Sequence, residues 1–566
     1  MKINVAYFSM EIMLRTHIPT YAGGLGVLAG DLLRSCADME IPTVGMTLVY
    51  NGKAFNQVFQ PDGTQNYTEI DWRKSDQFTK MPHRITLKVQ GQDIVVGCWR
   101  YDIVGYSRYV IPVYLLDTDY FVNPQWARDI TADLYGSGNN VRICQEIVLG
   151  IGGIKMLRAL GYSEIDCYHL NESHSALVPV ALEPEHNYID SEVKKKCVFT
   201  IHTPIPEGHD SFDYETAYKC GGDYLPWHIR DIATTNKLDM TYLALNMSKY
   251  SFGVSRRQGA LSRHMFPGYN IGTITNGVHH RTWTASTMQD LYNQYLPEWL
   301  KDPAVLAQAP EKLPDSQLWE AHQQTKKTLV SFINKHLTSS RNAQEHAHPD
   351  QDELFDTETL TIALARRPVR YKRPLLIYRD LLRLTRIGAG KIQIIQSGKS
   401  HPSDDVSKGI VQEILRISKK LKGVVRIVYI ENYSPKVARL LVSGSDVWLN
   451  TPQRPLEASG TSGMKAAMNG CLNFSVLDGW WIEGYAMRPD AGFAIGALDE
   501  SLMPANDDAA DSEDLYSKLE HEIIPLYYTK KDEWARRMKQ AIALGAYFNT
   551  NRCIQEYMEK AWNLVT

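Results

Sequence analysis

The chain has 566 residues, of which 44% are hydrophobic and 22% are charged, a balance typical of globular proteins and unlike that of disordered chains. At roughly 100–200 residues per domain, this length predicts about two to four domains. Lys and Arg number 61 against 64 Asp and Glu, and the net charge of -3 argues against binding of nucleic acid through an overall cationic field. No apolar run reaches the about 20 residues that a membrane-crossing helix needs, so no membrane association is expected.

The first residues and the cysteines predict a cytoplasmic protein. Residues 1–8 predict a first β-strand and not a signal peptide, because no small-residue cleavage site follows an apolar core. The eight cysteines are scattered and form no C-x-x-C pair. In a long chain without a secretion signal, we interpret them as buried thiols in a reducing compartment.

Short apolar, β-branched runs that end in Gly, Asn, His or Ser recur in two series. The first series lies at residues 4–9, 42–50, 166–171, 197–202, 251–255 and 271–276, and the second at residues 360–366, 391–397, 424–429, 446–450 and 471–477. Such runs, alternating with amphipathic stretches of helix length, indicate buried parallel strands in βαβ units. The predicted fold class is therefore α/β, with two Rossmann-like doubly wound domains, residues 1–285 and 286–566, facing a central cleft. Ligands of such sheets bind beyond the carboxyl ends of the strands.

Two helices and a polar segment are predicted in the second half. The helices span residues 315–337 and 532–544, the latter with Asp532 as its N-cap. We expect the C-terminal helices to pack back on the N-terminal domain. Residues 338–357 predict a surface loop, and its His346 and His348 could bind a metal; exposed polar loops often carry such histidines, so no metal site is expected.

A glycine-rich loop, Gly23-Gly24-Leu25-Gly26, follows the first strand and precedes a helix predicted to begin at Val27. Glycines let a backbone approach an anion closely, and a helix N-terminus directs N–H groups at it. Tight turns also use glycine for steric reasons alone, so the motif leaves both interpretations open.

Residues 366–373 carry five cations directly after a predicted strand, namely Arg366, Arg367, Arg370, Lys372 and Arg373. The fork of an Arg side chain and the point charge of a Lys suit phosphate oxygens. The alternative interpretation is a solvated, basic helix start.

The most informative segment is residues 454–470, in which small residues and glycines follow a strand and lead into a helix. This pattern again favours a phosphate cradle, to which Thr461 adds a hydroxyl. Glu457 can accept hydrogen bonds from sugar hydroxyls. Lys465 stands among small and apolar residues, where a lysine can act as an imine-forming amine; the alternative is an exposed helical cation.

Ordered blocks of this chain resemble the α-glucan phosphorylase family, which comprises the glycogen, starch and maltodextrin phosphorylases. The blocks lie at residues 21–30, 169–176, 200–206, 275–278, 365–373, 431–433 and 457–470. The likeness is greatest to the short bacterial and archaeal members, which lack the N-terminal extension that controls the animal enzymes, so allosteric regulation is not expected. The resemblance implies the GT-B glycosyltransferase fold and an α-1,4-glucan phosphorylase. Such an enzyme cleaves the non-reducing ends of glycogen or maltodextrin with inorganic phosphate and releases α-D-glucose 1-phosphate with retention.

The resemblance also implies a cofactor and its ligands. Lys465 would form a Schiff base with pyridoxal 5'-phosphate. The phosphate of this cofactor would be held by Arg366, Tyr433, Thr461 and Ser462. That phosphate, with a second pKa of about 6, would relay a proton to the glycosidic oxygen through the substrate phosphate. Three anionic groups would then crowd together, which accounts for the density of cations after residue 365.

Further residues would bind the substrates. Arg367 and Lys372, with the backbone at Gly24, would hold inorganic phosphate. The glucosyl unit would be surrounded by Leu25, His202, Asn276, Glu457, Ala458, Ser459 and Gly460. The carbonyl of His202 would face the developing positive charge, and Glu172 and His174 match positions near the acceptor channel. The catalytic set is thus Lys465, Arg367, Lys372, His202 and Glu457.

Three positions depart from the family pattern. Ser434 stands where an Arg often follows the tyrosine matched by Tyr433, and Arg454 is a candidate to replace that contact. Arg370 stands where animal enzymes carry an acid, and Gln258 replaces a histidine. These departures affect the expected phosphate affinity, substrate length or regulation.

Two alternatives remain open at the level of sequence. A nucleotide-sugar glucosyltransferase of the glycogen- or starch-synthase type would share the fold and the Gly-Gly-Leu-Gly loop, but it has no need of Lys465. A catalytically weak, glucan-binding homologue would have no need of the phosphate-binding cations. A homodimer is the expected assembly.

Overall fold

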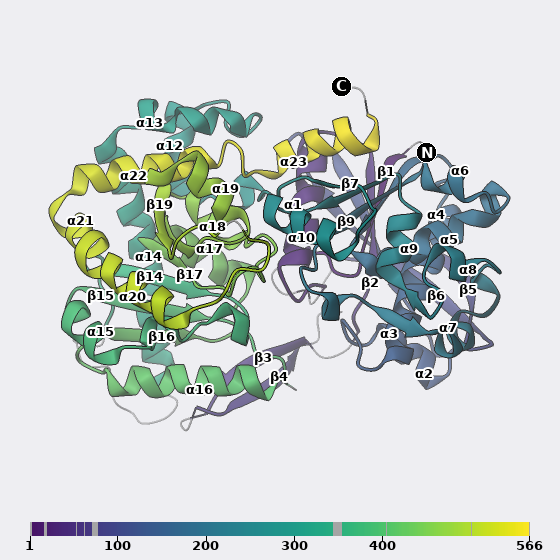
Figure 1. The fold of residues 1–566 in the computed structure, drawn as a ribbon, viewed down its shortest axis with the longest axis horizontal. Coiled ribbons are helices and arrows are strands. Elements are labelled where there is room, and N and C mark those ends of the chain that lie inside the picture. The colour runs from purple at the N-terminus through teal and green to yellow at the C-terminus, as the bar shows by residue number, and fades with distance from the viewer. Residues whose placement is uncertain are drawn as a thin grey trace. The chain divides into compact units, whose positions relative to one another are not determined.

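The computed structural model describes residues 3–15, 18, 20–51, 54–60, 63–70, 77–342, 354–402, 404–499 and 501–564. The chain forms two compact units. The first contains residues 1–54, 70–276 and 550–566, and the second contains residues 55–69 and 277–549. Each unit has its own sheet covered by helices (Figure 1).

The first unit is built on a nine-stranded sheet in the order β13-β12-β9-β8-β1-β2-β7-β6-β5. Its strands are β1 (Ile3–Ser9), β2 (Thr43–Leu48), β5 (Thr79–Val89), β6 (Gln92–Val104), β7 (Val110–Asp117), β8 (Ile165–Asn171), β9 (Cys197–Ile201), β12 (Tyr250–Gly253) and β13 (Ile271–Thr273). All neighbours pair in parallel except β7 with β6 and β6 with β5. The strand order reverses between β1 and β8, so this is where the sheet offers a ligand crevice.

Helices cover this sheet, and a short antiparallel pair, β10 (Ser211–Asp213) and β11 (Lys237–Asp239), lies beside them. The principal helices are α1 (Gly24–Asp38), α3 (Asn139–Ile147), α4 (Gly153–Ala159), α5 (Leu177–Leu182), α7 (Tyr214–Gly221), α9 (Met240–Asn246) and α10 (Arg256–Met265). The last α-helix of the chain, α23 (Thr550–Tyr557), packs on α1, where the Ser35 and Thr550 hydroxyls lie 2.6 Å apart. The C-terminal residues therefore complete the hydrophobic core of the first unit.

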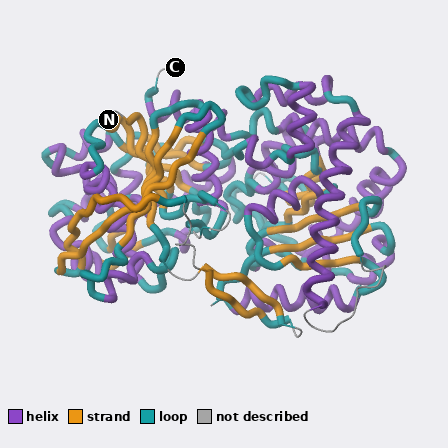
Figure 2. Tube along the Cα trace, turned by 180° about the vertical axis from the view of Figure 1, so that it is seen from behind, coloured by secondary structure: helices purple, strands orange, loops and turns teal. Residues whose placement is uncertain are grey.

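The second unit is built on a six-stranded parallel sheet in the order β16-β15-β14-β17-β18-β19, crossed by one long helix (Figure 2). Its strands are β14 (Leu360–Ala365), β15 (Ile392–Ser397), β16 (Arg426–Ile430), β17 (Val447–Asn450), β18 (Leu472–Val476) and β19 (Gly492–Ile495). The order reverses between β14 and β17. The hairpin β3 (Ala54–Phe59) and β4 (Gln65–Ile70) lies beside α16 (Asp405–Lys420), and the Phe59 amide donates to Glu431 at 3.2 Å.

The main helices of this unit flank the sheet. They are α12 (Ser286–Tyr295), α14 (Asp315–Asn342), α15 (Leu381–Gly388), α16, α17 (Pro435–Gly444), α18 (Ser462–Ala467), α19 (Trp480–Met487), α20 (Asp508–Lys518), α21 (Ile524–Thr529) and α22 (Lys531–Leu544). Both predicted series of parallel strands are present, each in one sheet. The α/β fold class is therefore confirmed.

Three predicted boundaries are wrong. Helix α1 begins at Gly24 and not at Val27, so the second and third glycines of the loop belong to its first turn. Helix α14 continues through Asn342 into the predicted polar loop, because a helix with one apolar stripe tolerates polar residues on its other side. Helix α22 has Lys530 as its N-cap, and Asp532 stands in the first turn. His346 and His348 lie outside the described residues.

All eight cysteines are buried and unbridged, as predicted. Among the residues that the structure describes, no helix combines the length and the apolar character that a membrane span requires.

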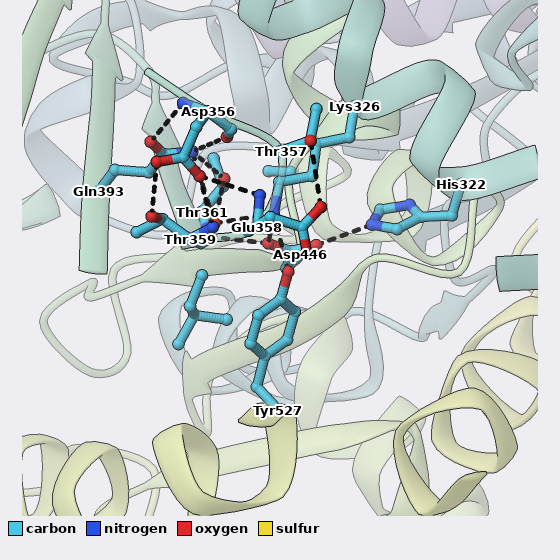
Figure 3. Close-up of polar contacts among 12 residues, drawn as sticks. His322, Lys326, Asp356, Thr357, Glu358, Thr359, Thr361, Gln393, Asp446 and Tyr527 are labelled. Atoms are coloured by element: carbon cyan, nitrogen blue, oxygen red, sulfur yellow. Dashed lines mark hydrogen bonds and ion pairs between the residues drawn. The ribbon is translucent and has the colours of Figure 1, made fainter. Parts of the chain in front are cut away.

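A buried network of charged groups fixes α14 to the amino end of the six-stranded sheet (Figure 3). Asp446, just before β17, accepts from Lys326 Nζ at 2.6 Å, His322 Nε2 at 2.8 Å and the Thr361 amide at 2.7 Å. Lys326 also donates to the Thr359 carbonyl at 2.8 Å and to the Tyr527 hydroxyl at 2.9 Å. Burial opposes ionisation of Asp446, but Lys326 and His322 hold its pKa below the ordinary value.

We expect Lys326→Met to lower the free energy of unfolding by about 3–5 kcal/mol, because it leaves the carboxylate of Asp446 buried without its cation. Urea titration at pH 7, followed by circular dichroism, measures the change. Lys408→Met is the matched control, since it removes an exposed pair with Asp405 on α16 and should change little. Equal midpoints for both variants would contradict this account of the network.

Candidate active site

The two segments that follow β14 and β17 form the ligand edge of the six-stranded sheet. Because the strand order reverses between these strands, their carboxyl ends leave a crevice there. Backbone contacts join the segments directly: the Gln453 amide donates to the Tyr371 carbonyl at 2.6 Å, and the Thr451 hydroxyl donates to the Lys372 carbonyl at 3.0 Å.

Arg373 holds the segments that follow β14 and β17 together. Its buried guanidinium donates to the carbonyls of Thr451 at 2.9 Å and Pro452 at 2.8 Å, and it pairs with Asp508 and Asp511 at 2.7 Å each. One of the five predicted phosphate-binding cations is thus a structural residue that holds the two segments together.

Lys372, Arg366 and Glu457 come together at the crevice. Lys372 forms an ion pair with the Glu457 carboxylate, and Arg366 Nη1 lies 3.5 Å from Oε2 of the same group. Burial opposes ionisation of Glu457, but Lys372 and then Arg366 hold its pKa below the ordinary value. Two cations share one carboxylate, which leaves a local excess of positive charge suited to an anion.

Arg366 has unused donors in this place. Its Nε and Nη1 are buried and have no hydrogen-bond partner among the described residues. Burial lowers the pKa of its guanidinium. Burial also raises the pKa of the nearby Tyr433 hydroxyl to about 12, against the opposing effect of Arg366. A buried cation with unused N–H groups is the donor that a phosphate group needs.

Arg367 lies apart from this cluster. Its side chain is 58% exposed, and its Nη2 lies 3.6 Å from Asp404 Oδ2. It is therefore free of the close contacts that hold Arg366 and Lys372.

Arg454, the candidate for the missing contact to the cofactor phosphate, pairs with Asp511 in this structure. It donates to both carboxylate oxygens of Asp511, at 3.1 and 2.9 Å, and to the Ile495 carbonyl at 3.0 Å. Ser434 is the N-cap of α17 and accepts from the Val437 amide at 3.4 Å.

Lys465 is buried on the short helix α18, between β17 and β18 in the chain. Its Nζ lies 3.9 Å from the centre of the Trp283 ring. Asn469 holds the two residues in place, since its Nδ2 donates to the carbonyls of Lys465 and Trp283 at 2.9 Å each. The pairing with Trp283 was not predicted, because Trp283 lies far from α18 in the chain; Asn469 lies within the segment singled out by sequence, but no role was predicted for it.

The residues before Lys465 are closely packed. Ser462 accepts from Trp448 Nε1 at 3.2 Å, and the Lys465 amide donates to the Thr461 carbonyl at 3.3 Å. A Cβ at Gly463 would lie 2.3 Å from Asn473 Oδ1, so only glycine fits. Gly460 has a φ of 80°, which favours glycine.

The segment 457–460 is fixed to the turn before α19. The Glu457 amide donates to Asp478 Oδ2 at 2.9 Å, and the Ser459 carbonyl accepts from the Trp480 amide at 2.8 Å. Ala458 lies between them. The Ser459 Oγ is buried and has no hydrogen-bond partner among the described residues, so it can serve a bound group.

In the first unit, a carboxylate occupies the glycine-rich loop. Glu11, after β1, accepts from the amides of Ala22 at 2.6 Å and Gly23 at 3.0 Å, and from the Tyr135 hydroxyl at 2.8 Å. Gly26 is required there, because a Cβ would lie 2.8 Å from Glu11 Oε2. Gly24 is exposed and Leu25 half-buried at the start of α1. Sequence reasoning missed Glu11, although a carboxylate directly after a strand was a usable signal.

Glu172 organises the segment after β9. Its buried carboxylate accepts from the amides of His202 at 2.9 Å and Thr203 at 3.1 Å, and from the Thr203 hydroxyl at 3.0 Å. Its backbone, at φ 75° and ψ 162°, occupies a region that is otherwise left to glycine, so these bonds hold a strained residue. His202 Nε2 lies 2.8 Å from Asn171 Oδ1, and burial lowers the pKa of the ring.

Three other residues singled out by sequence lie in the first unit. His174 is buried, with Nε2 3.5 Å from Asp210 Oδ2; burial and then Arg142 lower its pKa to about 4. The Asn276 carbonyl accepts from Arg552 at 3.2 Å. Gln258 is buried and satisfied, accepting from the Val254 amide at 2.9 Å and donating to Ser262 at 2.8 Å.

Comparisons with known proteins identify related sequences. The sequence model of the carbohydrate phosphorylases matches residues 215–522, and that of the starch synthase catalytic domain matches residues 5–258. A maltodextrin phosphorylase of Thermococcus litoralis is 35% identical over 99% of this chain and 70% of its own length. A glycogen phosphorylase of Aquifex aeolicus is 34% identical over 99% of this chain and 86% of its own length. A glycogen phosphorylase of Mycobacterium tuberculosis is 32% identical over 98% of this chain and 70% of its own length.

Two doubly wound sheets, each with polar loops at its switch point, together with these matches define a glycosyltransferase of the GT-B fold. Within that class, the chain belongs to the carbohydrate phosphorylase family.

We expect Glu172→Gln to lower the free energy of unfolding by about 2 kcal/mol at pH 7, since it weakens hydrogen bonds to a charged acceptor. Burial raises the pKa of Glu172, but His202, His209, His174 and the Ser173 amide together lower it to about 2. The carboxylate therefore stabilises the fold fully above about pH 4.5 and less as the pH falls toward 2.

Urea unfolding at a series of pH values measures this effect, with Glu164→Gln, at an exposed glutamate before β8, as the control. The difference in free energy of unfolding between the wild type and Glu172→Gln should become smaller below about pH 4.5. If this difference in free energy of unfolding stays constant down to pH 3, the substitution acts through packing and not through the charge of Glu172.

Proposed function

We propose that this chain is an α-1,4-glucan phosphorylase. In the reaction, the bond from C1 of the terminal glucosyl unit to the glycosidic oxygen breaks, and a bond from C1 to a phosphate oxygen forms on the same face. A proton from inorganic phosphate ends on the leaving glycosidic oxygen, and the products are α-D-glucose 1-phosphate and a glucan shorter by one unit. The observation that carries the proposal is a buried lysine, Lys465, in the same unit as a cation cluster around Glu457 in a member of this family.

Pyridoxal 5'-phosphate is the proposed cofactor, and the residues of the second unit fit it. Lys465 supplies a buried primary amine against the Trp283 ring, which matches an aromatic aldehyde. The unused, buried N–H groups of Arg366 match its phosphate, with Tyr433, Thr461 and Ser462 as the other ligands. When bound, the cofactor supplies a phosphate monoester whose second pKa of about 6 suits proton exchange near neutral pH.

Lys372 and Arg367 are proposed to bind inorganic phosphate. Lys372 is held in place by Glu457, whereas Arg367 is exposed, with its Nη2 3.6 Å from Asp404 Oδ2, so it can turn to a ligand. These cations, with Arg366, offset the repulsion between two phosphates, which would cost several kcal/mol at an intermediate dielectric.

The glucosyl unit is proposed to lie against Glu457, Ala458, Ser459 and Gly460. Glu457 is ionised and can accept from sugar hydroxyls, and Ser459 has an unused buried hydroxyl. From the first unit we propose Gly24, Leu25, His202 and Asn276. The Glu172 carboxylate fixes the amide of His202 and so orients its carbonyl, which can stabilise positive charge that develops at C1.

A second candidate, a nucleotide-sugar glucosyltransferase, is favoured only by the match of residues 5–258 to the starch synthase catalytic domain. That match covers the first unit for the most part, whereas Lys465 and the cation cluster lie in the second. Release of glucose 1-phosphate from maltodextrin and phosphate, set against transfer from a nucleotide sugar, separates the two.

We expect Lys465→Ala to lose the near-ultraviolet absorption band of bound cofactor and all measurable release of glucose 1-phosphate, while far-ultraviolet circular dichroism stays unchanged. The reason is that no other primary amine would remain at this position. Absorption spectra, and peptide mapping after borohydride reduction, test it.

Lys436→Ala, at an exposed lysine on α17, is the control and should keep both cofactor and activity. Cofactor retained by Lys465→Ala, or trapped on another lysine, would overturn the cofactor assignment. Wild-type protein that binds cofactor yet releases no glucose 1-phosphate would favour the catalytically weak, glucan-binding homologue.

We expect Arg367→Ala to raise the KM for phosphate about tenfold or more, because a charge-assisted hydrogen bond is worth about 1.5–3 kcal/mol. Binding of maltodextrin should change little. Initial rates at varied phosphate, and glucan affinity by calorimetry, measure the two effects. Arg386→Ala, at an exposed arginine on α15, is the control. An unchanged KM for phosphate would remove Arg367 from the phosphate site.

A further inference from the structure

A second polar cluster lies in the first unit, among residues that the glucan reaction does not use. Glu183 begins a 3₁₀ turn, Glu183–His186, and Asp190 begins helix α6 (Asp190–Lys194). His228 is the N-cap of helix α8 (Ile229–Ile232). One ligand atom from each side chain can be chosen so that all three lie within 4.8 Å of one another.

The spacing of these atoms matches a metal site. His228 Nε2 lies 3.0 Å from Asp190 Oδ1 and 3.8 Å from Glu183 Oε1. Around a tetrahedral Zn²⁺ with bonds of about 2.0–2.1 Å, neighbouring ligand atoms lie roughly 3.3 Å apart. One imidazole and two carboxylates are also a ligand set that suits divalent transition metals, with a fourth position left for water.

The burial of Glu183 is the independent sign of a missing partner. The residue is fully buried, and neither carboxylate oxygen has a hydrogen-bond partner among the described residues. A carboxylate that is buried without donors is costly, and a cation would offset that cost.

We propose that Glu183, Asp190 and His228 bind one divalent transition-metal ion of the Zn²⁺ class. The ion would join the 3₁₀ turn and α6 to α8, segments that are separate in the sequence. Asp190 is 40% exposed on its side chain, which gives the ion an entry path and leaves the fourth position open to water. The ion would lie outside the machinery of the glucan reaction, because none of its three residues belongs to the set proposed for that reaction.

We expect this site to bind the ion more weakly than a site whose histidine ligand has a hydrogen-bond partner. A metal-bound histidine usually donates its second ring N–H to a partner, and loss of such a partner costs about 10–100-fold in affinity. The Nδ1 of His228 is buried and has no hydrogen-bond partner among the described residues.

The test uses the full-length, tag-free chain after treatment with EDTA. Calorimetric titration with Zn²⁺ should show one saturable site per chain, and Co²⁺ should give the visible absorption bands of a tetrahedral complex. Zn²⁺ should also raise the melting temperature. His228→Ala should weaken Zn²⁺ binding about tenfold or more and remove the Co²⁺ bands.

Glu183→Gln is the second variant, because it keeps the size of the side chain and should weaken binding even if His228→Ala does not fold. His264→Ala, at an exposed histidine of the same unit, is the control for adventitious binding and should bind as the wild type does. The proposal is overturned if the wild type shows no saturable site. It is also overturned if Glu183→Gln binds Zn²⁺ as tightly as the wild type.

Discussion

The second unit depends on one constraint, that more cations than carboxylates stand at the point where its strand order reverses. Lys372 and Arg366 share Glu457, and Arg366 keeps buried N–H groups that no described residue uses. Such an arrangement is unfavourable without an anion, because like charges repel and buried donors lose their water. The network of Arg373 with Asp508 and Asp511 holds the two segments in place despite this repulsion.

In the first unit, buried negative groups hold the loops that follow the strands. Glu11 and Glu172 follow the neighbouring strands β1 and β8, and each binds backbone amides of a loop: residues 22–23 in one case and residues 202–203 in the other. The carboxylates of Glu11 and Glu172 therefore hold loops in the first unit, and the guanidinium of Arg373 holds two segments together in the second. In both, the charged group satisfies backbone groups at the carboxyl ends of parallel strands, which the sheet itself leaves unpaired.

The amino end of the six-stranded sheet shows that buried charge in this protein is not confined to the candidate site. Asp446 is buried there and is hydrogen-bonded to the buried side chains of Lys326 and His322. There Asp446 and Lys326 are hydrogen-bonded to each other, whereas at the carboxyl end Arg366 forms only a 3.5 Å ion pair with Glu457 and its buried Nε and Nη1 have no hydrogen-bond partner among the described residues. The structural network and the candidate active site therefore differ in whether their buried polar groups are hydrogen-bonded, and not in burial as such.

The sequence by itself determined the α/β class, both strand series and the family blocks, because buried parallel strands and glycine-rich turns leave local patterns of residues. It also indicated Lys465, Glu457 and the cations after residue 365. Only the tertiary structure decided which of these cations pair with carboxylates and which keep unused hydrogen-bond donors. Arg373 and Arg454 pair with Asp511, which is remote in sequence, while Arg366 keeps unused donors. It likewise placed residues 55–69 in the second unit and 550–566 in the first, and it brought Trp283 to Lys465 and Glu183 to His228. Such pairings depend on how distant segments pack, and the residue types of each segment alone do not encode them locally.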